Sequence, residues 1–324
     1  MLTSNEILEK INAYIDGLPY TRNPQSLYEP VKYVLSMGGK RIRPTLMLLA
    51  YNLYKEDPES ILQSACAIET YHNYTLLHDD LMDNADMRRG KPTVHVKWDA
   101  NTAILSGDSM FALAFWRMLQ CPEDKLKPIL ELFTETALEI GEGQQYDMDF
   151  ETRTDVTEDE YIEMIRLKTS VLLACAMKIG AILADASAED ADNLYKFGEQ
   201  VGLAFQLQDD YLDVYGDLAV FGKAIGGDIL CNKKTYMLIN AYNRANDRQR
   251  EELKKWILAK QYDPKEKIAA VTSIYNELGI NLLAEEKIKY YFDQSRKYLT
   301  AVSVPEERKE ILKAYADEMM RRKH

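Results

Sequence analysis

The chain has 324 residues, of which 46% are hydrophobic and 28% charged, and its formal net charge at pH 7 is −12. These fractions exclude a disordered chain and a collagen-like fibre. The negative charge argues against nucleic acid as a partner, because phosphate backbones are bound by clustered Lys and Arg. The four cysteines lie far apart without a CxxC pair, which indicates reduced thiols rather than a zinc ribbon or a disulfide scaffold.

No segment of the sequence is typical of a targeting signal or a membrane span. Charged Glu6, Glu9 and Lys10 already stand near the start of the chain, where a signal peptide would have an apolar core. The most apolar run, residues 171–184, is interrupted by Lys178, and a span needs about 18 apolar residues in a row. We therefore expect a cytoplasmic protein without integral membrane contact.

Signals for helix ends and starts recur along the chain, while the alternating runs typical of strands are nearly absent. Gly38-Gly39 is suited to end one helix, and Pro44 can begin the next. Asp57-Pro58 places a capping residue before a proline at the first helical position. These patterns predict a helical N-terminal part.

The second half of the chain carries similar signals. Thr157 with Glu160 forms a capping box at the start of a helix. Asp263-Pro264 opens another helix, which Gly279 can end. The polar stretch 148–160 is expected to be a loop. No linker divides the chain and no fixed repeat period is found, so we expect one all-α domain over residues 1–324 rather than a helical solenoid.

Two segments far apart in the sequence share the pattern DDxxD. Residues 77–83 (LHDDLMD) resemble residues 207–213 (LQDDYLD), and each ends a long apolar-periodic helix. The first helix has a stripe that begins apolar and ends acidic: Ile61, Ala65, Ile68, His72, Leu76, Asp79 and Asp83. A second stripe joins Gly202, Gln206, Asp209 and Asp213. We therefore expect these carboxylates to face the interior.

Buried carboxylates at such spacing repel each other and lose hydration unless a cation compensates. Carboxylates four residues apart on a helix suit a hard divalent ion, and Mg2+ favours few carboxylates together with waters and substrate phosphates. A solvated acidic helix end would explain one such motif alone. Two copies, each on an otherwise apolar stripe, favour a metal site.

Cationic residues accompany both motifs. Residues 38–44 (GGKRIRP) place three cations beside a glycine hinge at a helix junction, an arrangement suited to anions. Residues 88–92 (RRGKP) follow the first DDxxD, and further donors are Lys168, Lys223, Lys233 and Lys234. Each cation alone could be a solvated surface charge. Together with metal-binding carboxylates they indicate a diphosphate site, and the net charge of −12 predicts that substrate binding depends strongly on Mg2+.

A resemblance to a known family extends from about Leu27 to about Lys234. Six motifs carry it, in the order in which that family has them: GGKRIRP (38–44), HDDLMDNADMRRGKPT (78–93), GQQYDM (143–148), KTS (168–170), FQLQDDYLDVYGD (205–217) and GKAIGGDILCNK (222–233). In these motifs the chain resembles the trans-type isoprenyl diphosphate synthases, or polyprenyl synthetases. The resemblance implies an all-α bundle around a deep central cavity, usually a homodimer, with the two DDxxD motifs facing each other across the cavity mouth.

The resemblance also implies roles for individual residues. Asp79 and Asp83 would bind two Mg2+ ions and Asp209 a third, with support from Asp80, Asp210 and Asp213. The allylic diphosphate would be held by Arg88, Lys168, Thr169, Gln206, Lys223 and Lys233. The diphosphate of isopentenyl diphosphate would be held by Lys40, Arg43, His72 and Arg89, although the stripe position of His72 alone also fits a core histidine. The C-terminal Arg321-Arg322-Lys323 resembles a basic tail that helps to close the site in some relatives.

The implied activity is that of a short-chain prenyltransferase. It would condense isopentenyl diphosphate with C5, C10 and possibly C15 allylic diphosphates by Mg2+-assisted ionisation, giving farnesyl or geranylgeranyl diphosphate. Bulky residues upstream of Asp79 would close the bottom of the cavity, the floor, and so limit the length of the growing chain. The resemblance assigns this role to Tyr74. Tyr71 would be a second bulky residue, and Thr75 lies beside them. Tyr74 is rotated by about 140° from Asp79 on an ideal helix, so spacing alone does not place it there.

Two other functions are compatible with part of these motifs. A class I terpene cyclase shares the first DDxxD but usually has an Asn/Ser/Glu-type second metal motif, and it has no use for residues 38–44. A non-catalytic subunit of a heteromeric synthase usually lacks one aspartate motif, whereas this chain keeps both.

Overall fold

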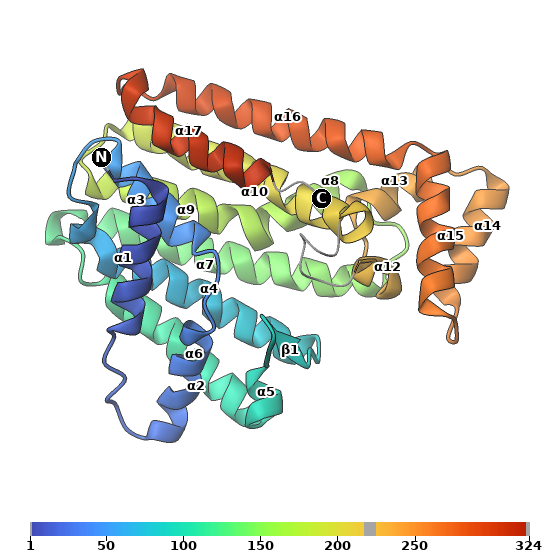
Figure 1. Ribbon diagram of the computed structural model, residues 1–324, viewed down its shortest axis with the longest axis horizontal. Helices are drawn as coiled ribbons and strands as arrows, with labels where there is room; N and C mark the ends of the chain where they lie inside the picture. The colour runs from blue at the N-terminus through green and yellow to red at the C-terminus, as the bar shows by residue number, and fades with distance from the viewer. Residues whose placement is uncertain (1, 217–224, 322–324) are drawn as a thin grey trace. The chain divides into compact units, whose positions relative to one another are not determined.

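The protein is almost entirely helical (Figure 1). The computed structural model describes residues 2–216 and 225–321. Within these ranges the only strands are β1 (Met87–Arg88) and β2 (Lys91–Pro92), which form an antiparallel hairpin. The predicted all-α fold is therefore confirmed. No helix in these ranges is both long enough and apolar enough to cross a membrane.

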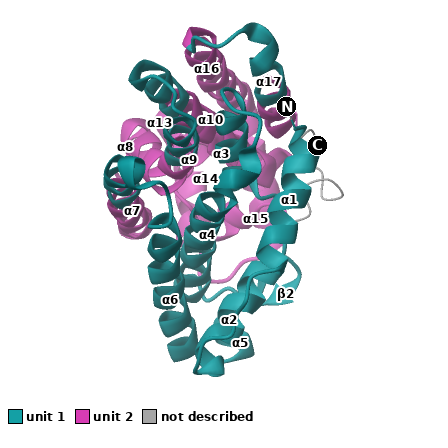
Figure 2. Ribbon diagram, turned by 90° about the vertical axis from the view of Figure 1, so that its left-hand side faces the viewer, with its two compact units in different colours: residues 1–134, 175–195, 302–312 teal, residues 135–174, 196–301, 313–324 magenta. Residues whose placement is uncertain are grey.

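The chain forms two compact units, shown in teal and magenta in Figure 2. Unit 1 comprises Met1–Thr134, Cys175–Tyr195 and Val302–Leu312, and unit 2 comprises Glu135–Ala174, Lys196–Ala301 and Lys313–His324. Four helices contribute residues to both units: α7 (Glu123–Thr152), α9 (Val171–Leu183), α10 (Ala188–Tyr215) and α17 (Glu306–Met320).

The remaining elements of unit 1 come from the N-terminal part of the chain. They are α1 (Ser4–Asp16), α2 (Gln25–Ser36), α3 (Ile42–Asn52), the 3-10 helix η1 (Pro58–Ile61), α4 (Leu62–Met82), the hairpin, α5 (Val94–Lys97) and α6 (Ala100–Met118). Helix α4 lies along α6. The two helices approach closely at Gly107, because a Cβ there would collide with the ring of His78. His78 also donates from Nε2 to the carbonyl of Ile104 at 3.3 Å, which fixes the end of α4 that carries the first DDxxD.

The remaining elements of unit 2 come from the middle and the C-terminal part of the chain. They are α8 (Glu158–Ile165), the five-residue π-helix η2 (Arg166–Ser170), α12 (Gly227–Leu230), α13 (Tyr236–Arg244), α14 (Asp247–Leu258), α15 (Pro264–Glu277) and α16 (Ile280–Ala301). One hydrophobic core joins them, and it includes Tyr161, Leu207, Leu253 and Tyr275. Helix α10 passes close to η2 at Gly202, where an added Cβ would lie 2.6 Å from Cα of Ser170.

Most predicted helix boundaries are confirmed. Thr157 and Glu160 form the capping box of α8, and Asp263 caps α15, which ends before Gly279 with its positive φ of 65°. Each device supplies partners for backbone groups that a helix end leaves unpaired. Helix α2 ends at Ser36, just before the glycine pair.

Two local predictions were wrong. Asp57 makes no capping hydrogen bond, and its carboxylate instead accepts from the Tyr51 hydroxyl at 3.0 Å, so Pro58 opens a short 3-10 helix. The predicted loop 148–160 is helical up to Thr152. Its charged residues are compatible with an exposed helix face, and Gln145 donates to Asp149 one turn further at 2.8 Å.

Candidate active site

The first aspartate motif ends α4 in unit 1. The amide of Asp83 donates to the Asp79 carbonyl at 2.8 Å, so the helical turn continues through the motif and both side chains lie on one face. Burial falls along the predicted stripe, from fully buried Ile68 to half-buried Asp79 and exposed Asp83. The expectation that both carboxylates face the interior was therefore wrong for Asp83, because α4 ends there. The buried member of the motif is Asp80, only 5% exposed.

Arg88 holds the buried Asp80 carboxylate. Its Nε lies 2.7 Å from both oxygens of Asp80. Burial raises the pKa of the Asp80 carboxyl, and the charge of Arg88 opposes this rise. The hairpin brings Arg88 back to the helix through a two-residue turn in which Arg89 and Gly90 have φ of 51° and 73°, as in a type I′ turn. Arg88, predicted to contact diphosphate, thus also orients the aspartate motif.

The three cations of residues 38–44 have different environments. Arg41 forms an ion pair with Glu69 at 2.7 Å, with both side chains 2% exposed, and it donates to the Leu35 carbonyl at 2.7 Å. It therefore anchors the junction between α2 and α3. Lys40 is exposed, and Arg43 points toward α4, where its Nη1 lies 3.2 Å from Nε2 of His72.

The Arg43–His72 pair combines a neutral histidine with a guanidinium whose Nε is buried. A guanidinium only donates, so Nε2 of His72 accepts and its proton resides on Nδ1. Burial and the nearby arginines hold the pKa of His72 well below 6.5. Burial also lowers the pKa of Arg43 to about 10, and its Nε is buried with no acceptor among the described residues. A buried donor without an acceptor is costly, and an anion would satisfy it.

Arg89 lies against the glycine pair. Its guanidinium donates to the Gly38 carbonyl, and a Cβ on Gly39 would come within 2.8 Å of that guanidinium. Both glycines have positive φ, 77° and 132°, which also disfavours a side chain. Of the four residues predicted to hold isopentenyl diphosphate, Arg43 and His72 are thus in direct contact, and Arg89 packs on the loop that carries Lys40.

Upstream of Asp79, unit 1 contains a cluster of aromatic rings. Tyr71 is buried and packs edge-on against Tyr74 at 5.4 Å and against Phe133 at 5.4 Å between ring centroids. Tyr74 packs edge-on against Phe111 at 5.4 Å. Thr75 turns its hydroxyl back to the His72 carbonyl at 2.8 Å. The three residues predicted to set chain length therefore lie on one stretch of α4, with Tyr71 fixed in the core.

In unit 2 the π-helix η2 presents the predicted Lys168 and Thr169. Lys168 forms an ion pair with Asp147 at 2.6 Å, and the Thr169 hydroxyl donates to Oε1 of Gln206 at 3.1 Å. Short π-helical segments are rare and frequently occur at functional sites. Gly143 of α7 allows this segment to approach, because a Cβ there would collide with the Lys168 amide.

The second aspartate motif repeats the arrangement of the first. Asp210 is 4% exposed, whereas Asp209 and Asp213 are half-buried. The amide of Gln206 donates to Asp210 at 3.0 Å, and the Tyr161 hydroxyl donates to its other oxygen. Burial raises the pKa of Asp210 to about 7, helped by the charge of Asp228 and opposed by Lys233.

Lys233 belongs to the same network. Burial acts to raise the pKa of Asp147, but the charges of Lys168 and Lys233 outweigh burial and lower this pKa. Unit 2 therefore contains seven of the predicted residues: Lys168, Thr169, Gln206, Asp209, Asp210, Asp213 and Lys233. Lys223 and the basic residues Arg322 and Lys323 lie outside the described residues.

Three residues of this network were not predicted from the sequence: Asp147, Tyr161 and Asp228. Asp147 lies inside the GQQYDM motif, and its ion-pair partner Lys168 lies 21 residues later in the KTS motif. Tyr161 lies in the first turn of α8 and has the pattern of an ordinary core aromatic, and it is indeed buried.

In the described part of the chain, no three His, Cys, Asp or Glu side chains form a ready-made metal cluster. The donor set nevertheless fits Mg2+, because this ion usually takes one or two carboxylates and completes its shell with water and phosphate oxygens. The half-buried or exposed carboxylates of each motif, spaced four residues apart on one helix, supply such donors.

Replacing Gly143 with alanine is expected to lower the free energy of unfolding by about 1–3 kcal/mol, because the new methyl group must displace η2. Gly141 on the same helix is the matched control, since a Cβ there meets nothing within 4 Å. Alanine at that position should be neutral or stabilise by up to about 1 kcal/mol. Urea unfolding of both variants measures the difference, and equal stabilities would contradict the close packing at Gly143.

Comparison with known proteins identifies the class of protein to which this fold and site belong. The family model of polyprenyl synthetases matches residues 24–277, more than half of the chain. The chain therefore belongs to the polyprenyl synthetase family, and the predicted prenyltransferase class is confirmed.

Individual relatives agree with this assignment. The chain is 43% identical to a geranylgeranyl diphosphate synthase of Methanosarcina mazei over 72% of this chain and 73% of that protein. It is 38% identical to a geranylfarnesyl diphosphate synthase of Natronomonas pharaonis over 74% of this chain and 75% of that protein.

Solved structures confirm the isoprenoid synthase fold. A crystal structure of a geranylgeranyl pyrophosphate synthase has a TM-score of 0.93 and 39% identity, with 100% of both chains covered. A polyprenyl synthase from Caulobacter crescentus, solved with calcium and isoprenyl diphosphate, has a TM-score of 0.87 and 26% identity, with 98% of this chain and 96% of that chain covered.

Proposed function

We propose that this prenyltransferase condenses isopentenyl diphosphate with C5, C10 and possibly C15 allylic diphosphates to give farnesyl or geranylgeranyl diphosphate. The observation that carries the proposal is the shared design of the two aspartate motifs. In each, the middle carboxylate is buried and hydrogen-bonded, Asp80 by Arg88 and Asp210 by Tyr161 and Gln206. The outer carboxylates are more exposed, which suits them to metal ions and substrate. The names of the relatives support a short-chain product.

In this proposal Asp79, Asp83 and Asp209 hold three Mg2+ ions, with Asp80, Asp210 and Asp213 in support. Bound Mg2+ supplies positive charge that stabilises the leaving diphosphate. The calcium in the Caulobacter crescentus neighbour supports a divalent ion, and the all-oxygen donors favour a hard one.

The cationic residues divide between two diphosphates. Arg88, Lys168, Thr169, Gln206, Lys223 and Lys233 hold that of the allylic substrate. Lys40, Arg43, His72 and Arg89 hold that of isopentenyl diphosphate. The buried Nε of Arg43, which has no acceptor in the described part of the chain, supports the second assignment. So does the neutral His72, whose Nδ1 proton is available to donate.

The side chains position the substrates and stabilise charge during the reaction. Arg and Lys stabilise the charge that develops on the allylic diphosphate as its C–O bond ionises. The double bond of isopentenyl diphosphate then attacks the allylic carbocation, forming the new C–C bond. A proton leaves the adjacent carbon, and the released diphosphate accepts it. The protein excludes water that would quench the cation, and no side-chain nucleophile takes part.

The exposed face of α6 supports a homodimer. Five apolar residues on one side of this helix and its end are more than a third exposed: Ile104, Leu105, Phe111, Trp116 and Leu119. At 100° per residue all five fall within an arc of about 140° on one side of the helix, and such exposed apolar surface is typical of protein interfaces. We propose that a second copy of the chain covers it, that residues 1–324 act as one polyprenyl synthetase domain, and that the enzyme works in the cytoplasm.

Substrate binding is expected to require Mg2+. Isothermal titration with an allylic diphosphate should show an affinity at least about tenfold lower in EDTA than in Mg2+, because the chain's net charge of −12 repels the ligand. Titration in Ca2+ provides a second divalent control. Equal affinity with and without a divalent ion would contradict the metal assignment.

The test of the function is product analysis. The pure protein is incubated with Mg2+, isopentenyl diphosphate and each of the C5, C10 and C15 allylic diphosphates, and the products are separated by length. We expect linear C15 or C20 diphosphates. Cyclic hydrocarbons formed without isopentenyl diphosphate would favour a cyclase, and no turnover would favour a non-catalytic subunit.

A further inference from the structure

The short turn that follows α12 is held by an unusual buried lysine. The turn contains Asn232, whose φ of 56° lies in the left-handed region. The Asn232 amide donates to the Ile257 carbonyl of α14 at 3.2 Å and accepts from Nζ of Lys267 at 2.7 Å. Both ends of this side chain are therefore fixed, which stabilises a backbone conformation that non-glycine residues rarely adopt.

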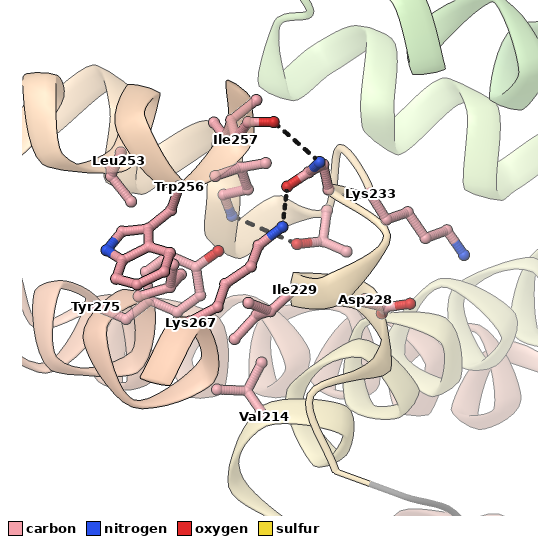
Figure 3. Close-up of a pocket in the computed structure, with 13 residues that line it drawn as sticks. Val214, Asp228, Ile229, Lys233, Leu253, Trp256, Ile257, Lys267 and Tyr275 are labelled. Carbon is pink, nitrogen blue, oxygen red and sulfur yellow. Dashed lines mark hydrogen bonds between the residues drawn. The ribbon is translucent and has the colours of Figure 1, made fainter. Parts of the chain in front are cut away.

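Lys267 comes from α15 and points into the turn (Figure 3). It is only 1% exposed. Besides Asn232, its Nζ donates to the Leu230 carbonyl at 3.2 Å and lies 4.3 Å from the ring centroid of Tyr262. The Tyr262 hydroxyl donates to the same Leu230 carbonyl at 3.2 Å. The two hydrogen-bond acceptors of Lys267 are thus neutral oxygens, and among the described residues no carboxylate pairs with Lys267.

This burial is costly for a cation. An ammonium group loses hydration in the interior, and neutral acceptors return only part of that free energy. Burial accordingly lowers the pKa of Lys267. The cavity beside it holds about 10 Å³, which leaves no room for a ligand larger than a water molecule. The two hydrogen bonds of Lys267 are instead made to the turn itself.

Two charged residues of the candidate active site belong to this segment, Asp228 in α12 and Lys233 in the turn. The amide of Lys233 donates to the Asp228 carbonyl at 2.9 Å, so the two residues are linked through the backbone. At the other end of α12, the Asp228 amide donates to the Asp213 carboxylate at 2.9 Å. Asp228 and Lys233 line the same cavity as Lys267, and in Figure 3 their side chains extend to the side away from Lys267. Asp213 therefore fixes one end of this segment and Lys267 fixes the other.

We propose that Lys267 is a positioning residue, which fixes the Leu230–Lys233 turn so that Lys233 can bind the allylic diphosphate. The proposal rests on the proposed function, which places Lys233 at that diphosphate. It assigns a role in substrate binding to a residue of α15 that itself contacts no substrate.

The test compares Lys267→Met with Lys265→Met on the same helix. Methionine keeps most of the side-chain stem, while Lys265 is exposed and its loss changes the net charge equally. Lys267→Met should raise KM for the allylic diphosphate at least about tenfold, as expected when a supporting shell is removed. KM for isopentenyl diphosphate should stay within about threefold. Lys265→Met should change neither, and Lys267→Arg should recover part of the loss.

A double-mutant cycle with Lys233→Ala separates positioning from general stability. If Lys267 acts through Lys233, the double variant should be no more than about threefold worse than Lys233→Ala. The proposal would be overturned if the KM increase of the double variant equalled the product of the two single increases. It would also be overturned if Lys267→Met lowered only the melting temperature and left KM unchanged. Should Lys267→Met not fold, Asn232→Gly removes the amide that Lys267 binds while tolerating the positive φ, and it should raise the same KM.

A direct binding measurement keeps this proposal separate from the proposed function. Calorimetry with inorganic diphosphate and Mg2+ needs no turnover. Lys267→Met should bind at least about tenfold more weakly than the wild-type protein. If the wild-type protein binds diphosphate but makes no prenyl product, the proposed function fails while Lys267 is still tested. Equal binding by both proteins would overturn the role of Lys267 alone.

Discussion

Replacing Asp79 or Asp209 with alanine is expected to lower turnover at least about 100-fold, a loss of about 2.7 kcal/mol of transition-state stabilisation. Each carboxylate is assigned to a metal ion that stabilises the leaving diphosphate. The outer carboxylates are more exposed than the buried Asp80 and Asp210, so removing them should cost little stability. Steady-state kinetics with saturating Mg2+ and thermal unfolding would be measured on the same preparations.

Asp124→Ala and Asp247→Ala are the matched controls, since both side chains are exposed and start helices far from the aspartate motifs in sequence. They remove the same charge and should leave turnover within about twofold. Near-normal rates in both Asp79→Ala and Asp209→Ala would refute the metal assignment. A lowered rate that is accompanied by a clearly lowered melting temperature would show a structural role instead.

Tyr74→Ala is expected to lengthen the product by at least one C5 unit. Tyr74 packs on Phe111 and Tyr71, five residues before Asp79 on the same helix, and it is less buried than Tyr71. Removing its ring leaves space in the aromatic cluster that a longer chain can fill. Product length with isopentenyl diphosphate in excess would be measured by chromatography against C15, C20 and C25 standards.

Tyr71→Phe is the control for this experiment. It keeps the ring that contacts Tyr74 and Phe133 and removes only the hydroxyl, so product length should not change. A full truncation at Tyr71 is less informative, because removing such a buried aromatic ring costs about 3–5 kcal/mol. An unchanged product profile in Tyr74→Ala would show that Tyr74 does not form the floor.

The features of this fold that could be predicted from the sequence are those encoded locally. The capping box of Thr157 and Glu160 and the glycine after α15 mark helix ends through residues within one turn of them. The helical period likewise placed each DDxxD at the end of a long helix. Asp57 failed as a cap because its carboxylate accepts from Tyr51 instead, a competing contact that the local pattern does not reveal.

The details of the site depend on contacts that the spacing of residues does not encode. Helical periodicity placed Asp79 and Asp83 toward the interior, yet the buried carboxylates are Asp80 and Asp210. Asp80 is satisfied by Arg88 through the hairpin, and Asp210 by Tyr161, which lies 49 residues earlier in the chain. The π-helix that presents Lys168 and Thr169 likewise has no counterpart in the periodicity.

The most direct test of the metal assignment is a crystal structure of the protein with Mg2+ and a non-ionisable allylic diphosphate analogue. We expect Mg2+ ions with oxygens of Asp79, Asp83 and Asp209 at about 2.0–2.1 Å, sharing one diphosphate. Metal ions at only one motif would contradict the account. So would a separation of more than about 15 Å between the carboxylates of the two motifs, since the ions of one metal cluster lie only about 4 Å apart.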